Sequence, residues 1–226
     1  MPFRSLCVGS SGAGKTYCMV KTILEYWPPT AIKRLIWVAP EYSLAQPAVR
    51  LLADTFGDQF VGIDAGKVAQ WTTKVQDEVT LNLTKGRQRD KSGKYPADCL
   101  LIIDDMLTAK SRGSFVATLF TTGRHLGCSI IELAQQIFQK DGRAQRLQCT
   151  SYWLFGFGGS ADEVDRFLRT IVTKAYRKPL FRKYQEITER PGKGHFLYVD
   201  MTAPSTALGR YRDSSLTNPI TVQPEP

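Results

Sequence analysis

The sequence predicts an α/β fold in which a mostly parallel central sheet is flanked by helices. Several short runs of aliphatic residues show no alternation with polar residues, which is typical of strands buried on both faces of a parallel sheet. Segments with apolar side chains at helical spacing separate these runs. A chain of 226 residues suits one such domain and can bury a full core. We assign residues 1–202 to this domain, and residues 203–226, rich in Pro, Ser and Thr, to an extended C-terminal tail.

The predicted elements alternate along the chain, and prolines and glycines separate them. The sequence predicts strands at residues 3–8, 32–39, 60–63, 98–105, 128–134, 152–157 and 194–201. It predicts helices at residues 17–27, 44–56, 65–85, 114–122 and 161–172, and a basic segment, irregular or helical, at 180–190. Ser160 and Glu163 have the spacing of a capping box for the helix that starts at residue 161.

The first strand leads into the segment GSSGAGKT, which has the spacing of a phosphate-binding loop in its required context of strand, loop and helix. Gly9, Gly12 and Gly14 can adopt positive φ, so the loop can curl around a phosphate chain with its N–H groups turned inward. Lys15 is expected to reach the β- and γ-phosphates, and the Thr16 hydroxyl to bind Mg²⁺. The candidate nucleotide-binding residues are Gly9, Ser10, Ser11, Gly12, Ala13, Gly14, Lys15, Thr16 and Tyr17.

Two carboxylates, Asp104 and Asp105, end the strand predicted at residues 98–105. Because ligands of open α/β sheets bind at the carboxyl ends of the strands, this pair has the position of a Walker B motif. We assign Asp104 to Mg²⁺ and Asp105 to the attacking water. Gln135 ends a later strand, and its amide is expected to contact the γ-phosphate or this water. Together these motifs predict a P-loop NTPase that uses ATP and Mg²⁺.

The chain carries a formal net charge of +9, which favours a polyanionic partner such as nucleic acid. Five of its basic residues lie in one short segment, residues 85–94, with two glycines and little apolar content. Lys and Arg neutralise phosphates without a fixed base geometry, so this segment is a candidate DNA-contacting loop. A solvated loop without a ligand explains the same composition.

The five cysteines are scattered and form no C-x-x-C pair, which favours reduced core thiols over a disulfide framework or a zinc site. No apolar run approaches the roughly 20 residues of a membrane span. The first predicted strand begins at residue 3, so we expect no signal peptide before it. These features indicate an intracellular protein.

The order of the motifs resembles the HerA–FtsK superfamily of DNA-pumping ATPases. The segments that carry the resemblance are GSSGAGKT, LLIIDD, GRHLGCSIIELAQQ and Arg146 before a strand. Their spacing is similar to that in the genome-packaging ATPases of poxviruses and of internal-membrane bacterial and archaeal viruses. The resemblance implies a RecA-like P-loop fold in which Arg124 or Arg146 faces the nucleotide of a neighbouring subunit as an arginine finger. Two positions depart from the family pattern: Asp105 stands where Glu is common, and Gln148 where Asn is common.

The resemblance also implies a function, an ATP-driven motor that moves double-stranded DNA into a preformed viral capsid without reading its sequence. It implies a homo-oligomeric ring, a hexamer or pentamer, and partners at the capsid portal vertex or among inner-membrane proteins. The expected location is the host cytoplasm during assembly, with a virion vertex as a further location. Two alternatives remain at this point: a small P-loop nucleoside or nucleotide kinase, and a non-catalytic ATP-binding protein of DNA or capsid assembly.

Overall fold

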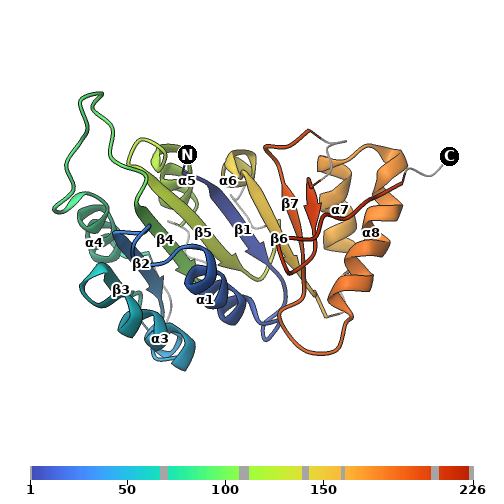
Figure 1. Cartoon of the computed structure of the whole chain (residues 1–226), viewed down its shortest axis with the longest axis horizontal. Helices are drawn as coiled ribbons and strands as arrows, with labels where there is room; N and C mark the ends of the chain where they lie inside the picture. The colour runs from blue at the N-terminus through green and yellow to red at the C-terminus, as the bar shows by residue number, and fades with distance from the viewer. Residues whose placement is uncertain are drawn as a thin grey trace. The chain divides into compact units, whose positions relative to one another are not determined.

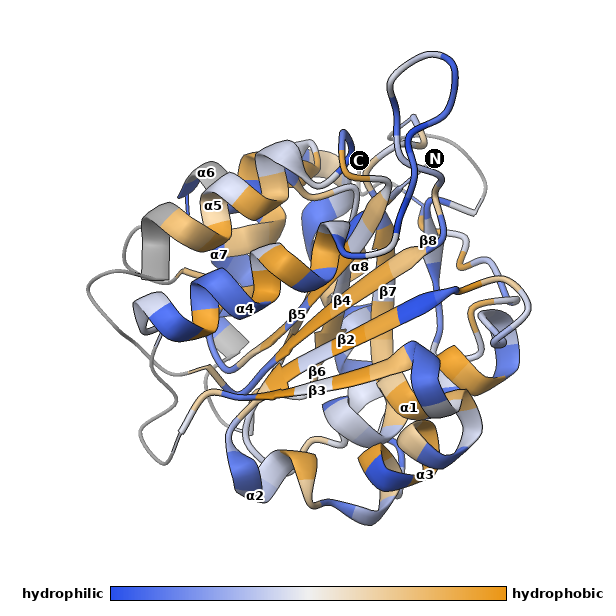
Figure 2. Cartoon of the chain, turned by 90° about the vertical axis from the view of Figure 1, so that its left-hand side faces the viewer, coloured by the Kyte–Doolittle hydropathy of each residue, from blue (hydrophilic) through white to orange (hydrophobic). Residues whose placement is uncertain are grey.

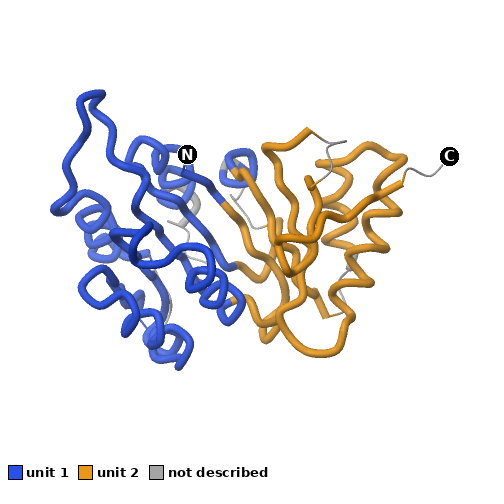
Figure 3. Tube along the Cα trace, viewed as in Figure 1, with its two compact units in different colours: residues 1–4, 16–133, 140–148 blue, residues 5–15, 134–139, 149–226 orange. Residues whose placement is uncertain are grey.

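The computed structural model describes residues 2–66, 71–106, 112–138, 143–158, 161–204 and 209–223. The chain forms two compact units, which Figure 3 shows in different colours. The first unit contains residues 1–4, 16–133 and 140–148, and the second contains residues 5–15, 134–139 and 149–226. The phosphate-binding motif therefore begins in the second unit, and its last residue, Thr16, belongs to the first.

The strands of the first unit lie in the order β3-β2-β4-β5, and each pair of neighbours is parallel (Figure 1). Their bounds are β2 (Arg34–Ala39), β3 (Phe60–Asp64), β4 (Cys99–Asp104) and β5 (Cys128–Ala134), of which Ala134 is assigned to the second unit. Every residue of β4 is buried, and β4 and most of β2 are hydrophobic (Figure 2). The unalternated aliphatic runs thus form the interior strands that the sequence predicts.

Helices cover both faces of these strands, with α4 and α5 on one side and α1 and α3 on the other (Figure 2). Their bounds are α1 (Lys15–Tyr26), α2 (Glu41–Leu44), α3 (Pro47–Phe56), α4 (Thr73–Thr84), α5 (Arg112–Thr122) and α6 (Arg143–Gln148), with a 3₁₀ turn, η1 (Gly57–Gln59). The helix predicted at residues 44–56 is divided because Pro47 starts a new helix at its first position. The helix predicted from residue 65 begins only at Thr73, where the Thr72 hydroxyl caps it by accepting from the N–H of Val75.

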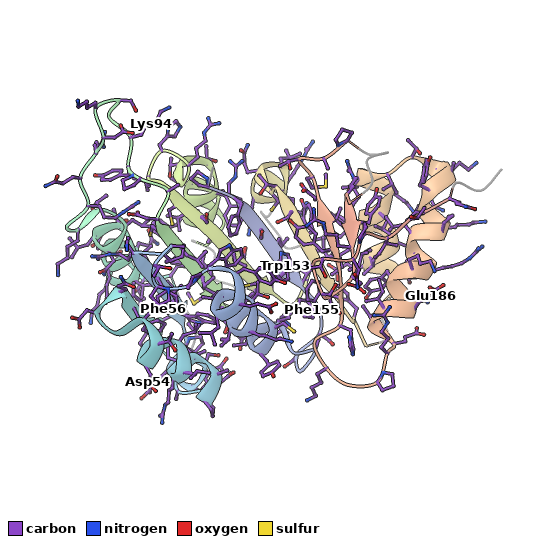
Figure 4. The ribbon with its side chains drawn as sticks, viewed as in Figure 1. Asp54, Phe56, Lys94, Trp153, Phe155 and Glu186 are labelled. Carbon is purple, nitrogen blue, oxygen red and sulfur yellow. The ribbon has the colours of Figure 1, made fainter. Side chains whose placement is uncertain are left out.

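The strands of the second unit lie in the order β1-β6-β7-β8. Their bounds are β1 (Arg4–Val8, in this unit from Ser5), β6 (Ser151–Phe155), β7 (Phe196–Asp200) and β8 (Tyr211–Arg212), and the helices are α7 (Ala161–Ile171) and α8 (Lys174–Thr188). β1 and β6 are parallel, whereas β7 and β8 are antiparallel additions. The side chains of Trp153 and Phe155, labelled in Figure 4, pack against Phe196 with ring centroids 4.7 and 4.9 Å apart. Parallel pairing thus predominates, which confirms the predicted α/β fold class.

The C-terminal segment differs from the extended tail predicted for residues 203–226. Tyr211 and Arg212 form β8 against β7, and the N–H of Ile220 donates to the carbonyl of Tyr211. The guanidinium of Arg210 is buried and donates to the carbonyls of Ala203 and Ile171. A buried charge that binds two carbonyls ties this segment to the second unit, so residues 209–220 are folded on its sheet.

The five cysteines are free and buried, as the sequence predicts for core thiols. In the part of the chain that the structure describes, no helix combines the length and apolar character needed to cross a membrane. The predicted cap Ser160 lies outside the described residues. Glu163, its predicted partner, has a different contact, which is described with the site below.

The phenol of Tyr184 gives the second unit a pH-dependent stability. Tyr184 is buried on α8 and donates to the carbonyl of Phe155 at 3.0 Å. Burial raises the pKa of Tyr184 to about 12, above a value of about 10 in the unfolded chain. Between these values the unfolded chain has lost a proton that the folded chain keeps, so stability falls as pH rises.

We therefore expect the free energy of unfolding to fall between pH 10 and pH 12, by about 1.4 kcal/mol per pH unit from this group. Denaturant unfolding of the wild type and of Tyr184→Phe across this range measures the effect. The wild type should lose stability more steeply than the variant, although the variant starts from a lower value. Equal slopes for the two proteins would show that the phenol does not contribute.

Candidate active site

The phosphate-binding loop connects β1 to α1 and is held against the end of β6. Gly12 and Gly14 have φ of +77° and +89°, the left-handed conformation that lets the loop curl. Gly9, which was expected to be able to adopt positive φ as well, does not adopt it. A Cβ on Gly9 would lie 2.6 Å from the Cβ of Phe155, so glycine is required there because β6 approaches closely. Both the N–H and the hydroxyl of Ser10 donate to the carbonyl of Gly156 at 3.0 Å, which fixes the start of the loop.

Lys15 supplies a positive charge directly at this loop. Its Nζ donates to the carbonyls of Gly9 and Ser10, at 2.7 and 2.9 Å. The ammonium is therefore folded back over the loop. A concave backbone with a lysine attracts an anionic phosphate chain.

In the first unit, the last residue of the motif meets the first carboxylate of the Walker B pair. The Thr16 hydroxyl donates to a carboxylate oxygen of Asp104 at 3.2 Å, although 88 residues separate them in the sequence. Asp104 is the last residue of β4 and is only 3% exposed. Mg²⁺ prefers hard oxygen ligands at 2.0–2.1 Å in octahedral geometry, which sets adjacent ligand oxygens about 2.9 Å apart. The two oxygens of this pair are of the right kind and nearly at this separation, so they fit the predicted Mg²⁺ site.

Asp105 has an unusual backbone conformation that turns the chain at the end of β4. Its φ is +50°, which non-glycine residues adopt rarely and Asp more easily than most. Its carboxylate accepts a hydrogen bond from the hydroxyl of Tyr42. This contact to Asp105 is the largest of the causes that raise the pKa of Tyr42 to about 12. The second carboxylate therefore has a fixed orientation and a protein donor.

Sequence reasoning missed Tyr42, because nothing in its local sequence points to a site. Tyr42 lies on α2, which directly follows β2, and β2 pairs with β4 so that Val38 stands beside Ile103. The carboxyl ends of these two strands are therefore neighbours. The only available signal was positional: a polar side chain soon after Pro40, at the carboxyl end of a parallel strand.

In the second unit, the end of β5 lies beside the phosphate-binding loop. The N–H of Gly9 donates to the carbonyl of Ala134 at 3.3 Å, and the half-buried Gln135 follows immediately. The predicted sensor amide is thus adjacent in sequence to a residue that contacts the loop.

A carboxylate from α7 holds the segment that follows Gln135. Glu163 accepts from the N–H groups of Ile137 and Phe138, at 2.5 and 2.9 Å. The guanidinium of Arg166, also on α7, lies 4.4 Å from the centroid of the Phe138 ring. Glu163 was predicted only as a helix cap, because the distant segment that it binds cannot be identified from local spacing.

The two arginine-finger candidates lie at the opposite edge of the first unit from Asp104. β4 and β5 are parallel, with Cys99 beside Cys128 and Asp104 beside Leu133. Arg124 precedes β5, so it stands at the amino ends of these strands, where it is exposed and its Nε donates to His125 at 3.3 Å. Arg146 is half-buried on α6, whose last residue, Gln148, accepts from Arg4 at the start of β1.

The basic segment at residues 85–94 divides into an anchor and an exposed loop. The side chain of Arg87 is 7% exposed and pairs with Asp98 at 2.9 Å. It also donates to the carbonyls of Leu83, Pro96 and Leu126. This arginine therefore has a structural role and is not a free DNA contact.

We call residues 88–94 the basic loop; it lies between α4 and β4 (Figure 1). Asp90 shapes its turn by accepting from the N–H groups of Ser92 and Lys94. Its basic side chains Arg89, Lys91 and Lys94 are exposed, and Figure 4 labels Lys94 on the loop. The loop presents these charges on a defined turn.

No protein-family model matches the chain, and no curated protein matches it. Among solved structures it is similar to the genome packaging NTPase B204 from Sulfolobus turreted icosahedral virus 2 in complex with sulfate. The TM-score is 0.57 at 17% sequence identity, over 94% of this chain and 95% of that chain. The match to the same NTPase in complex with ATP-gammaS has a TM-score of 0.54 at 17% identity, over 94% and 96% of the two chains.

A bacterial protein is also similar to the chain, the cytoplasmic domain of the type VII secretion ATPase EccC from Thermomonospora curvata. The TM-score is 0.53 at 14% identity, over 89% of this chain but only 24% of that chain. At these identities the matches show the fold, which is that of P-loop ATPases. The P-loop fold that the resemblance implies is therefore confirmed.

Proposed function

We propose that this protein is an ATP-hydrolysing motor that translocates double-stranded DNA into a preformed viral capsid. The contact between Thr16 and Asp104 carries the proposal, because it joins the phosphate-binding motif to the Walker B strand. If the glycine-rich segment were only a turn and the two carboxylates only the start of an acidic loop, nothing would require these residues to meet. The fold shared with B204, which is described as a genome packaging NTPase, supports the same assignment.

The residues of this chain have distinct tasks in the proposed hydrolysis. The loop amides and Lys15 bind the phosphate chain. Thr16 and Asp104 would hold Mg²⁺, which would supply positive charge against the phosphate chain. Asp105 orients the attacking water and accepts its proton, and the Tyr42 hydroxyl fixes the rotamer of this carboxylate. Gln135 contacts the water or the γ-phosphate.

The proposed motor is a homo-oligomeric ring, a hexamer or pentamer, with ATP between neighbouring subunits. An arginine at the amino edge of the strands cannot reach the nucleotide at the carboxyl edge of the same unit, so a finger at Arg124 or Arg146 acts on a neighbour. The ring works in the host cytoplasm during assembly, or at a virion vertex, with portal or inner-membrane proteins as partners. The net charge of +9 is consistent with duplex DNA as the cargo.

We assign DNA contact to the basic loop. Its exposed cations stand on a turn that Arg87 anchors from within the unit. Contacts of this kind neutralise phosphates and carry no sequence information. The loop could therefore contact a duplex in the same way at every position along its length, as the transport of DNA requires.

The test of the function is an ATPase assay with and without long duplex DNA, together with mass measurement of the assembly. We expect DNA to stimulate hydrolysis, and no small molecule to become phosphorylated. Lys91→Ala/Lys94→Ala should weaken DNA binding and lower the slope of log affinity against log salt by about two. The matched control is Lys174→Ala/Lys178→Ala, two exposed lysines of α8.

Each alternative predicts a different result in this assay. A phosphorylated nucleoside or nucleotide would identify a small kinase, and ATP binding without turnover would identify a non-catalytic assembly protein. If the α8 double variant weakens DNA binding and the loop variant does not, the assignment of the basic loop is wrong while the motor remains.

A further inference from the structure

The loop between α8 and β7, residues 189–195, lies directly against the phosphate-binding loop. Both belong to the second unit. The N–H of Gly194 donates to the carbonyl of Ala13 at 3.0 Å. This hydrogen bond joins segments about 180 positions apart in the chain, so no local pattern predicts it. We call residues 189–195 the covering loop.

Gly14 and the covering loop are in close backbone contact. A Cβ on Gly14 would lie 2.8 Å from the N of Gly194 and 3.3 Å from the Cβ of Lys193. Backbone at 2.8 Å leaves no room for a side chain, so the glycine of the GKT sequence is required here by the covering loop as well as by its own φ. The first side-chain carbon of Lys193 is thus placed beside the residue that precedes Lys15.

The covering loop has its own internal supports. His195 Nε2 lies 3.0 Å from the carbonyl of Pro191, which closes the turn. Gly192 and Gly194 have φ of +100° and +90°, so the tight bend depends on them. Arg190 pairs with Asp213 at 3.7 Å, next to β8. These contacts position the exposed side chain of Lys193.

We propose that Lys193 is a second cation of the nucleotide site and binds the phosphate chain of the nucleotide held by the loop. This inference rests on the proposed function and adds a residue to its site. The flexible four-carbon stem of lysine starts beside Gly14 and carries a compact charge that can turn to an anion in the loop. Lys15 donates to the carbonyls of Gly9 and Ser10 in the same loop, so Lys193 would add a second cation to the site.

The test is equilibrium binding of Mg·ADP, with adenosine as the uncharged probe. Lys193→Ala should weaken Mg·ADP binding about tenfold, which corresponds to about 1.4 kcal/mol. Adenosine binding and the melting temperature should not change, because neither depends on a charge at the phosphates. Lys193→Arg should keep most of the affinity, and Lys174→Ala, an exposed lysine of α8, is the control.

The outcomes separate the two proposals. If Lys193→Ala binds Mg·ADP within twofold of the wild type while Lys15→Ala loses binding, the role of Lys193 is wrong and the nucleotide site stands. If Lys193→Ala weakens adenosine and Mg·ADP equally, its effect is on loop structure and the phosphate contact is wrong. If the wild type does not bind Mg·ADP at all, the proposed function fails, and the role of Lys193 fails with it.

Discussion

Replacing Asp105 by asparagine is expected to lower kcat for ATP hydrolysis by about 10²–10⁴ while nucleotide binding stays close to wild type. Asparagine has the shape of aspartate but cannot accept the proton of the attacking water, and general-base catalysis contributes this range. Lys15→Ala should differ, because it removes a charge that binds the phosphates and should reduce both affinity and turnover. Steady-state ATPase rates and Mg·ADP affinities measure the two effects separately.

The matched control is Asp64→Asn. Asp64 also ends a strand of the first unit, but it is exposed and accepts from the N–H of Gly66 in a turn. It should leave hydrolysis unchanged. Retained hydrolysis in both Asp105→Asn and Lys15→Ala would falsify the site assignment.

Tyr42 provides a further check on the role of Asp105. Tyr42→Phe removes the donor that orients the carboxylate but keeps the ring. We expect kcat to fall, though by less than in Asp105→Asn, and adding Tyr42→Phe to that variant should have little further effect. Such non-additivity is expected of residues that act through one contact. Additive losses would assign Tyr42 a task independent of Asp105.

The shorter acid at position 105 departs from the family pattern, and the structure suggests how it is accommodated. Asp reaches less far than Glu from the end of the strand. The positive φ of Asp105 changes the direction in which its side chain leaves the backbone, and the Tyr42 hydroxyl supports it there. The Tyr42 contact comes from α2, which follows the neighbouring strand β2, so the departure cannot be interpreted from the Walker B segment alone.

The sequence predicted those parts of the molecule that depend on local chemistry. The aliphatic run of β4 and the spacing of the loop can each be recognised within one segment. The contact between Thr16 and Asp104 then follows from the general rule that the carboxyl ends of parallel strands meet at one edge. The predicted helix boundaries were less accurate where one capping residue determines the first residue of the helix, as Thr72 does for α4.

Contacts between distant segments that no motif marks could not be predicted. The loop pattern indicates that Gly9 can adopt positive φ, but its role in the structure is to leave room for the Cβ of Phe155. Arg87 was one of five basic residues of a solvated segment, yet it is buried because the carbonyl of Leu126 and the carboxylate of Asp98 meet it. In each case the reason lies on another element of the fold.

The remaining large effect concerns the arginine finger, and we expect it at Arg124. Arg124 is exposed at the amino edge of β5, where a neighbouring subunit can receive it, whereas Arg146 is half-buried on α6. Arg124→Ala should lower kcat by about 10³–10⁵, the range for fingers in related chemistry. Arg124→Lys should recover little, because a lysine lacks the planar fork of donors. Arg143→Ala, at an exposed arginine of α6, is the control.

Mixing experiments test whether the residue acts on a neighbour. Wild-type subunits doped with Arg124→Ala should lose DNA-stimulated ATPase activity more than proportionally, because each variant subunit disables the site of its neighbour in a coordinated ring. Doping with Asp105→Asn disables a subunit's own site and provides the comparison. A strictly proportional loss, or a larger effect from Arg146→Ala, would contradict the assignment to Arg124. A larger effect from Arg146→Ala would still indicate a finger that acts on a neighbouring subunit. The last residue of α6, Gln148, accepts from Arg4 at the start of β1, so α6 also lies at the amino edge of the strands.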